Sequence, residues 1–281
     1  MIYNMPEYWL MKKAEPIVPI GPYLAFSSPS SFTLQVSNAT KSWNGTLEYS
    51  TDASTWSTWD GTTTLSSVNN DGEYVLYLRG IGNTAITGFM TLMGIGGYLV
   101  LTGTDIKCIG NIENLLDYAT VGSESHPTMT DYCYFSLFQG CTGLIQAPAL
   151  PATTLTEGCY SAMFGNCTAL TQAPALPATT LASRCYSDMF SECTSLTQAP
   201  ALPAKTLATY CYQYMFFGCT GLKLSSTQTG EYTVAYRIPT AGTGTTATSA
   251  LTDMFTSTGG TFTGTPEINT TYYLSNTNTI V

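Results

Sequence analysis

The chain is poor in cations. Nine lysines and arginines stand against 18 aspartates and glutamates in 281 residues, so the formal net charge is −9, and only 10% of the residues are charged. A protein that binds nucleic acid needs clustered lysine and arginine to neutralise phosphates, and an anionic membrane surface attracts the same side chains. The composition therefore argues against a nucleic-acid partner and against binding to acidic lipid.

Long hydrophobic runs are also missing. The most apolar stretch, residues 89–101, holds three glycines and is shorter than the roughly 20 residues that cross a bilayer. Residues 1–21 lack the cationic start, apolar middle and small-residue cleavage site of a secretory signal peptide. We therefore expect no membrane insertion and a soluble protein that stays in, or is assembled in, the cytoplasm.

Histidine is almost absent, which limits the chemistry open to the chain. The one histidine, His126, precedes Pro127 in a polar stretch typical of a loop, where a catalytic residue is uncommon. Asp188 and Glu192 could share a helix face as paired carboxylates, but the equivalent residues of the preceding unit are Ala162 and Asn166. With no phosphate-binding glycine loop and no cluster of metal-ligand spacing, we expect no catalytic site, no metal and no cofactor.

Cysteine, in contrast, is plentiful and periodic. Eight of the nine cysteines form two series that each advance by 26 residues: Cys133, Cys159, Cys185 and Cys211, then Cys141, Cys167, Cys193 and Cys219. Three full units run over 133–158, 159–184 and 185–210, and a fourth breaks off after Leu222. A fixed period of this length indicates a solenoid, and Met254–Phe255 would mark one degenerate final turn.

The first part of each unit suggests a helix. At about 100° per residue, the second unit places Cys159, Tyr160, Met163, Phe164 and Cys167 on one face. These inner positions are nearly the same in every copy, whereas the outer positions vary. We therefore expect a stacked core on one side and, on the other, a variable face with candidate partner contacts at Phe135, Ser187, Asp188, Glu192 and Tyr214.

The second part of each of the three full units reads T-x-L, one further residue and then QAPALPA. Its prolines lack an N–H and fix φ, so this limb cannot be an ordinary central strand. We expect a short strand or bridge near residues 170–173 and extended chain beyond it. Gln146, Gln172 and Gln198 would then stack along the axis, as a structural amide ladder in preference to a row of ligand-binding residues.

The stretch Met163–Phe164–Gly165–Asn166–Cys167–Thr168–Ala169–Leu170 and its copies resemble the Ala-Phe-x-x-Cys-x-x-Leu core of BspA-like leucine-rich repeats. The resemblance covers residues 131–224, with Met in place of Ala, a longer unit and two prolines where that family has its strand. It implies a leucine-rich-repeat-like solenoid. It also implies attachment, because such repeats look like those of surface and phage-encoded proteins of gut bacteria.

The cysteines read best as reduced core residues. Two cysteines eight residues apart in a helix are separated by about 12 Å, which is too far for a disulfide. The spacing is not that of a zinc site, and His126 lies outside the series. We therefore expect nine free thiols that act as small apolar core residues, as suits a reducing compartment.

The N-terminal part changes to serine, threonine and aromatic residues with a period of two, notably at 32–36 and 74–78. This pattern predicts strands of a small antiparallel sandwich, with a hairpin over residues 47–59. Trp43, Trp56 and Trp59 are candidates for glycan stacking; half-buried positions in a sandwich core are the alternative, and the commoner one.

Taken together, the sequence predicts a mixed α/β repeat protein. Its expected parts are an attachment arm at 1–22, a β-sandwich-like domain at 23–88, a solenoid cap at 89–130, a leucine-rich-repeat-like solenoid with 26-residue coils at 131–224, and a β-rich C-terminal cap at 225–281. Candidate docking residues in the arm are Tyr3, Tyr8, Trp9 and Leu10.

The function hypothesis is a non-enzymatic, virion-attached display or adhesion protein of the phage head or tail fibre type. The arm would dock on other virion or surface proteins, and the β-domain and repeats would meet a host-surface glycan or protein; a fibre would be a homotrimer. The alternatives are a bacterial cell-surface adhesin or protein-binding scaffold of the BspA-like class and, third, a carbohydrate-active enzyme.

Overall fold

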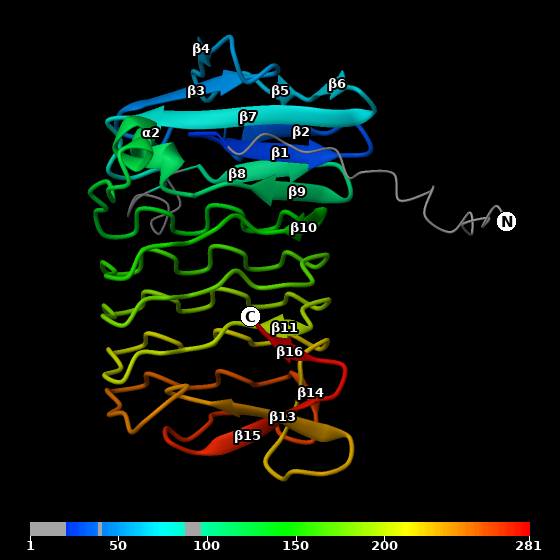
Figure 1. The fold of residues 1–281 in the computed structure, drawn as a ribbon, viewed down its shortest axis with the longest axis vertical. Coiled ribbons are helices and arrows are strands. Elements are labelled where there is room, and N and C mark those ends of the chain that lie inside the picture. The colour runs from blue at the N-terminus through cyan, green and yellow to red at the C-terminus, as the bar shows by residue number, and fades with distance from the viewer. Residues whose placement is uncertain (1–20, 39–40, 88–96) are drawn as a thin grey trace, which may run out of the picture.

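A computed structural model describes residues 21–38, 41–87 and 97–281. The docking residues Tyr3, Tyr8, Trp9 and Leu10 that we predicted for the attachment arm lie outside the described residues. The described chain forms a stack, with β-sheets at one end, repeated coils in the middle and a smaller sheet at the other end (Figure 1). Within the described ranges, no helix is long and apolar enough to span a membrane.

Two sheets form the N-terminal end of the stack. The larger sheet has the order β10-β9-β1-β7-β3-β4, and β6 pairs with β7 outside this path. Its strands are β1 (Leu24–Ser28), β3 (Thr46–Ser50), β4 (Ser57–Thr58), β6 (Val68–Asn70), β7 (Glu73–Ile81), β9 (Ile106–Ile109) and β10 (Leu144–Gln146). The smaller sheet has the order β5-β2-β8, formed by β5 (Leu65–Ser66), β2 (Thr33–Val36) and β8 (Leu99–Thr102).

The expected period-two strands are present, and the hairpin over 47–59 is confirmed. Strands β3 and β4 pair antiparallel, with Glu48 opposite Thr58 and Tyr49 opposite Ser57. Strands β8 and β9 come from the segment that we assigned to a solenoid cap, yet β8 pairs with β2 and β9 pairs with β1. Strand β9 also pairs in parallel with β10 of the first repeat unit, so the sheet leads directly into the repeat.

The prediction of a mixed α/β leucine-rich-repeat-like solenoid is wrong. The one α-helix of the described residues, α2 (Asn114–Gly122), precedes the repeat and is interrupted at Asp117 by extended backbone (φ −154°, ψ 100°). The predicted helical stretches of the units consist of consecutive turns, and the described secondary structure is otherwise made of short strands. The 26-residue units, called coils from here on, stack without helices (Figure 1).

Two sets of backbone hydrogen bonds alternate along each coil. Tyr134 N–H donates to Cys159 O at 3.0 Å, in the next coil, whereas Phe135 N–H donates to Tyr132 O at 3.1 Å, within its own turn. The pattern repeats in later coils, for example from Tyr160 N–H to Cys185 O at 3.0 Å. An α-helix would consume these N–H groups internally, so this hydrogen bonding between coils requires the turn conformation.

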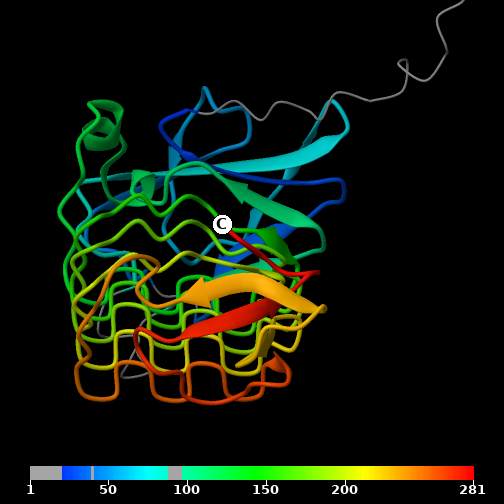
Figure 2. The same cartoon turned by 60° about the horizontal axis from the view of Figure 1, so that its bottom comes forward.

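Left-handed residues recur every four positions in these turns. In the second coil, Ala162 has φ 54° and Asn166 has φ 59°, and Asp188 and Glu192 occupy the same positions in the third. A helix has negative φ throughout, so a positive φ at every fourth residue excludes a helix here. These residues bend the chain sharply instead, and the coils show square corners in Figure 2. The period of four keeps residues i, i+4 and i+8 on one side, which over nine residues resembles the helical period of 3.6.

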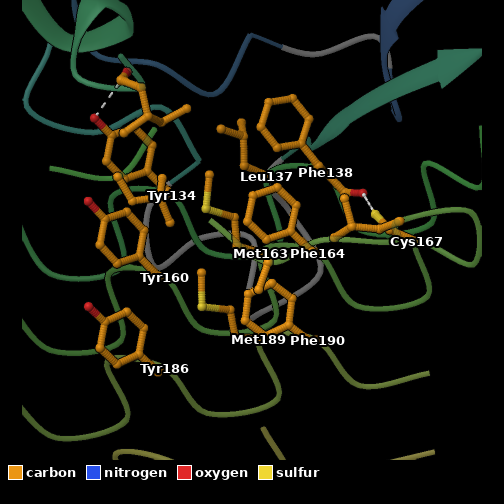
Figure 3. Packing of buried hydrophobic residues seen from close by; sticks show 14 of the residues in the cluster. Tyr134, Leu137, Phe138, Tyr160, Met163, Phe164, Cys167, Tyr186, Met189 and Phe190 are labelled. Atoms are coloured by element: carbon orange, nitrogen blue, oxygen red, sulfur yellow. Dashed lines mark hydrogen bonds between the residues drawn. The ribbon is translucent and has the colours of Figure 1, made fainter. Parts of the chain in front are cut away.

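The interior consists of equivalent side chains of successive coils stacked in columns, most of them identical (Figure 3). Ring centroids of the tyrosine column, which runs from Tyr134 to Tyr212, are 5.5 to 5.9 Å apart. The phenylalanine column has spacings of 5.6 to 5.8 Å and ends on Phe255. The stacking of Phe255, together with the bond from Phe216 N–H to Met254 O at 3.0 Å, confirms the degenerate final turn at Met254–Phe255.

All nine cysteines are free and buried, so the prediction that they fill the core is confirmed. They also satisfy backbone groups. The thiol of Cys167 donates to Phe138 O at 3.1 Å, that of Cys193 to Phe164 O at 3.1 Å, and that of Cys219 to Phe190 O at 2.9 Å. A cysteine at this position is therefore a small apolar side chain with a weak donor that links one coil to the preceding one.

The proline-containing limb has the bridges that we expected. Gln172 pairs in parallel with Gln146 on one side and with Gln198 on the other, so the three glutamines stack along the axis. The third coil contributes β11 (Gln198–Ala199), which pairs in parallel with β16 (Thr279–Ile280) at the end of the chain. The C-terminal residues thus extend the same row of strands.

A four-stranded sheet covers the last coil. Its order is β13-β15-β12-β14, formed by β13 (Tyr232–Arg237), β15 (Thr271–Ser275), β12 (Lys223–Ser225) and β14 (Gly259–Gly260). The strand expected at 232–236 is confirmed. One continuous hydrophobic cluster reaches from Leu24 in β1 to Leu274 in β15, so the predicted segments from residue 23 onward share one main core. A second, small cluster of Tyr23, Ala25, Val75 and Tyr77 belongs to the N-terminal sheet alone.

Candidate functional site: a groove on the variable face of the repeat

An open groove of about 700 Å³ runs across the successive coils. Its floor and sides come from residues of four coils, and Ser37, Asn38 and Tyr98 border it at the N-terminal end. The coil residues in its lining are Phe135, Ser136, Gln139, Ser161, Ala162, Gly165, Asn166, Arg184, Ser187, Asp188, Ser191, Glu192, Gln213 and Tyr214. This volume lies within the range of ligand-binding pockets, roughly 300–1,000 Å³.

The structure brings together every residue that we predicted for the variable face. Phe135, Ser187, Asp188, Glu192 and Tyr214 all line the groove. They do so through turns and not through the predicted helices. Asp188, Glu192 and Tyr214 have φ of 57°, 62° and 54°, at the corners where the chain bends. The stacked coils place equivalent corners above one another and so align the variable positions in one surface.

Two carboxylates give the groove a negative character. Ser187 Oγ donates to Asp188 Oδ2 at 2.6 Å. Burial raises the pKa of Asp188 above its usual value, and the hydrogen bond from Ser187 offsets only part of this rise. The carboxylate of Glu192 lies over Gly218 of the next coil, where a Cβ atom would come within 2.6 Å of it. Gly218 has φ +72°, so both the conformation and the space favour glycine.

Among the described residues that line the groove, Arg184 is the one cation. The Cζ atom of Arg184 lies 4.6 Å from the ring centroid of Tyr210. Its Nη1 atom lies 3.8 Å from Glu157 Oε1. Because these contacts hold its guanidinium beside another acid, Arg184 does not reverse the acidic character that Asp188 and Glu192 create.

Aromatic rings stand at both ends of the groove. Phe135 and Tyr98 are half-buried at the first coil, where Phe135 packs edge-on against Tyr132 at 6.1 Å between ring centroids. Tyr214 is half-buried at the fourth coil and packs edge-on against Phe217 at 5.9 Å. These neighbours fix the rings, so a ligand would meet preformed aromatic surfaces.

Several polar side chains of the groove have no protein partner among the described residues. The amides of Gln139, Asn166 and Gln213 and the hydroxyl of Ser191 make no hydrogen bond within that part of the chain. A polar group without a protein partner is free to bind a ligand or water. The groove therefore offers amides, hydroxyls and carboxylates between aromatic ends.

The tryptophans do not form a sugar-stacking platform. Trp43 and Trp59 are only 4% and 2% exposed and pack on each other with ring centroids 5.2 Å apart. Trp59 also donates its indole N–H to Thr63 O at 2.8 Å. The glycan assignment of these two residues is corrected accordingly, since buried rings present no face to a ligand. They belong to the core, the alternative interpretation of this cluster.

Trp56 is half-buried but already covered by protein. Its ring lies 4.0 Å from the guanidinium carbon of Arg79 and 5.8 Å from the ring of Tyr23. Arg79 is in turn fixed by Glu48, with Nε 2.7 Å from Oε2. The polar loop beside Trp56 is a turn, because Asp52 accepts backbone N–H groups of Ser54 and Thr55 at 2.8 and 2.7 Å.

The sequence analysis missed a contact between His126 and Glu113. His126 Nδ1 lies 2.9 Å from both carboxylate oxygens of Glu113, whose side chain is 1% exposed, while that of His126 is 58% exposed. The two residues are 13 positions apart along the chain, and no local pattern links them. Threonines line the two surface pockets beside His126, with Asp117 in one of them and Glu113 in the other.

A second open pocket, of about 530 Å³, has a different character. The proline limbs of the first two coils and the end of β9 line it, with Pro148, Pro151, Pro174 and Pro177 among its residues.

Among the residues that the structure describes, no group of three or more histidine, cysteine or acidic side chains could hold a metal ion.

Comparison with known proteins adds no relative. No family model matches the chain, and neither a curated protein nor a solved structure matches it.

Proposed function

We propose that this protein is a non-enzymatic adhesion protein that binds a neutral surface glycan in the groove of its repeat. The observation that carries the proposal is the lining of the groove, in which unpartnered amides and hydroxyls lie between half-buried aromatic rings. Sugars offer hydroxyls to such polar groups and flat C–H faces to aromatic rings. A hydrophobic ligand would leave the amides without partners, at a cost of about 1–3 kcal/mol each.

The charges favour a neutral glycan over an anionic one. Asp188 and Glu192 line the groove, and the whole chain has a formal charge of −9. An anionic glycan would be repelled at long range and would meet two carboxylates on arrival. A neutral sugar can donate its hydroxyls to the same carboxylates, and such charge-assisted hydrogen bonds are stronger than neutral ones.

Binding is preferred to catalysis because the acids are features of one coil. The positions equivalent to Asp188 are Ser136, Ala162 and Tyr214, and Asp188 is engaged by Ser187. Attachment to a virion through residues 1–22 stays a prediction, and its candidate docking residues lie outside the described residues. The bacterial surface adhesin and the protein-binding scaffold are the competing assignments, and they differ from this proposal in the groove's ligand.

A glycan array with neutral, sialylated and sulfated oligosaccharides tests the proposal, followed by titration calorimetry on the strongest neutral ligand. Gln213→Ala removes an unpartnered amide from the groove and should weaken binding about tenfold, the effect of losing about 1.4 kcal/mol. Gln172→Ala makes the same change in the row of bridged glutamines and should leave affinity unchanged. The absence of any neutral glycan among the ligands, or equal losses in both variants, would contradict the proposal.

A further inference from the structure

We infer that the groove binds a linear, β-linked oligosaccharide along the stacking axis, with one sugar unit at each of four coils. The inference rests on the proposed function and specifies the shape of its ligand. Its starting point is the direction of the groove, whose lining takes residues from each of the four successive coils and not from one loop.

The coils impose a regular spacing on this groove. Equivalent rings of neighbouring coils are 5.5 to 5.9 Å apart throughout the core. Bonds between coils, such as Ala162 N–H to Ser187 O at 2.8 Å and Asp188 N–H to Gln213 O at 2.8 Å, hold the corners of successive coils against one another. An extended chain of β-1,4-linked pyranoses advances by a similar length per sugar. A glycan along the axis can therefore keep register with the coils.

Each coil offers a different set of groups to its sugar. The first coil presents the Phe135 ring and the Gln139 amide, and the second presents the Ser161 hydroxyl and the Asn166 amide. The third coil presents Asp188 with Ser187 and Ser191, and the fourth presents the Gln213 amide with the Tyr214 ring. Aromatic surfaces thus lie at the two ends, and hydrogen-bonding groups lie between them.

This arrangement predicts how affinity depends on glycan length. Each added sugar reaches a new coil until the fourth, where Tyr214 covers the terminal ring. Because the coils stack rigidly through backbone hydrogen bonds, a short ligand cannot pull distant subsites together. Affinity should therefore rise by about tenfold per sugar, equivalent to about 1.4 kcal/mol, and stop rising after four units.

The test is titration calorimetry of the full chain with β-1,4-linked oligomers of glucose, mannose and N-acetylglucosamine, from one to six units long. At least one series should show the rise and the plateau at four. Tyr214→Asn removes the ring at the fourth coil and keeps a residue that tolerates φ near 54°, so its plateau should move to three units. Gln172→Ala should keep the plateau at four, and circular dichroism checks that both variants are folded.

The outcomes separate the inference from the proposed function. If neutral glycans bind on the array but affinity does not depend on length, or if only branched or α-linked glycans bind, the inference is wrong and the proposed function stands. If no neutral glycan binds at all, both are wrong. A plateau at four that stays unchanged in Tyr214→Asn places the ligand elsewhere and overturns the inference.

Discussion

At the residue scale, burial keeps the thiols and phenols of the core in their neutral, protonated form. Burial raises the pKa of Cys141, Cys159, Cys193 and Cys211 to about 12 and drives that of the remaining thiols well above its usual range. Burial also raises the pKa of the four stacked tyrosines, Tyr134, Tyr160, Tyr186 and Tyr212. These groups are neutral thiols and phenols in the folded protein and inert as nucleophiles at neutral pH.

The raised thiol pKa values predict that the protein loses stability in alkali. Above about pH 8.5 the thiols of the unfolded chain ionise while those of the folded protein stay protonated, so the unfolded state binds fewer protons and stability falls as pH rises. Each buried thiol removes about 1.4 kcal/mol per pH unit until its folded pKa is reached. Urea titrations from pH 7 to 10.5 should therefore show a steep fall in the free energy of unfolding.

A thiol count in the same samples provides the control. All nine thiols should be unreactive in native buffer at pH 8 and reactive in denaturant, because all are buried and free. A stability profile that is flat up to pH 10, or fast labelling of the native protein, would contradict this account of the core.

At the element scale, the four-residue turn determines the architecture. A left-handed residue at every fourth position costs roughly 1–2 kcal/mol for a side chain with a Cβ atom. The chain nevertheless places Ser136, Ala162, Asp188 and Tyr214 at such corners, with φ of 54° to 57°. Hydrogen bonds between coils and side-chain stacking offset this cost, so different side chains can occupy the corner position.

Ala162→Gly tests the turn directly. Glycine removes the steric cost of φ 54° in the folded state. It also increases the conformational entropy of the unfolded chain, which cancels part of this gain, so the variant should be more stable by about 0.5–1 kcal/mol. Ala175, an exposed residue of the proline limb, does not have a left-handed φ, and Ala175→Gly should be less stable by about 0.5–1 kcal/mol. Chemical denaturation measures both, and a helix at Ala162 would make both substitutions destabilising.

At the scale of the whole molecule, the sheets and coils are one packed body. The hydrophobic cluster is continuous from β1 to β15, the β9–β10 pairing joins the N-terminal sheet to the first coil, and β16 returns to the third coil. Each coil buries its faces only against its neighbours, so the sheets at the two ends cover the apolar surface that the terminal coils would otherwise expose.

This continuity predicts a single unfolding transition. In a Trp9→Phe background, tryptophan emission reports the N-terminal sheets through Trp43, Trp56 and Trp59. Pulsed thiol labelling reports the coils, which hold eight of the nine buried cysteines. The two signals should give the same urea midpoint, because the main hydrophobic cluster spans both parts. Separate midpoints would show that the sheets and the coils fold independently.

The period, the inner face and the variable face could all be predicted from the sequence. Stacked identical side chains require a fixed period, and a buried position such as Phe164 recurs as Phe138, Phe190 and Phe216. The helix could not be distinguished from the turn. The residues from Cys159 to Cys167 span too short a stretch to separate a period of 3.6 from one of four, and the prediction took the commoner structure.

The sequence by itself determined which side chains face inward, because apolar burial depends on composition and spacing along the chain. Only the tertiary structure decided how the coil bends, since the hydrogen bonds that favour turns over helices run to residues 25 positions away, as from Tyr134 to Cys159. It likewise decided that Trp43 and Trp59 are core residues, that His126 meets Glu113, and that the variable corners align into one groove. Each of these contacts joins segments whose proximity exists only in the folded stack.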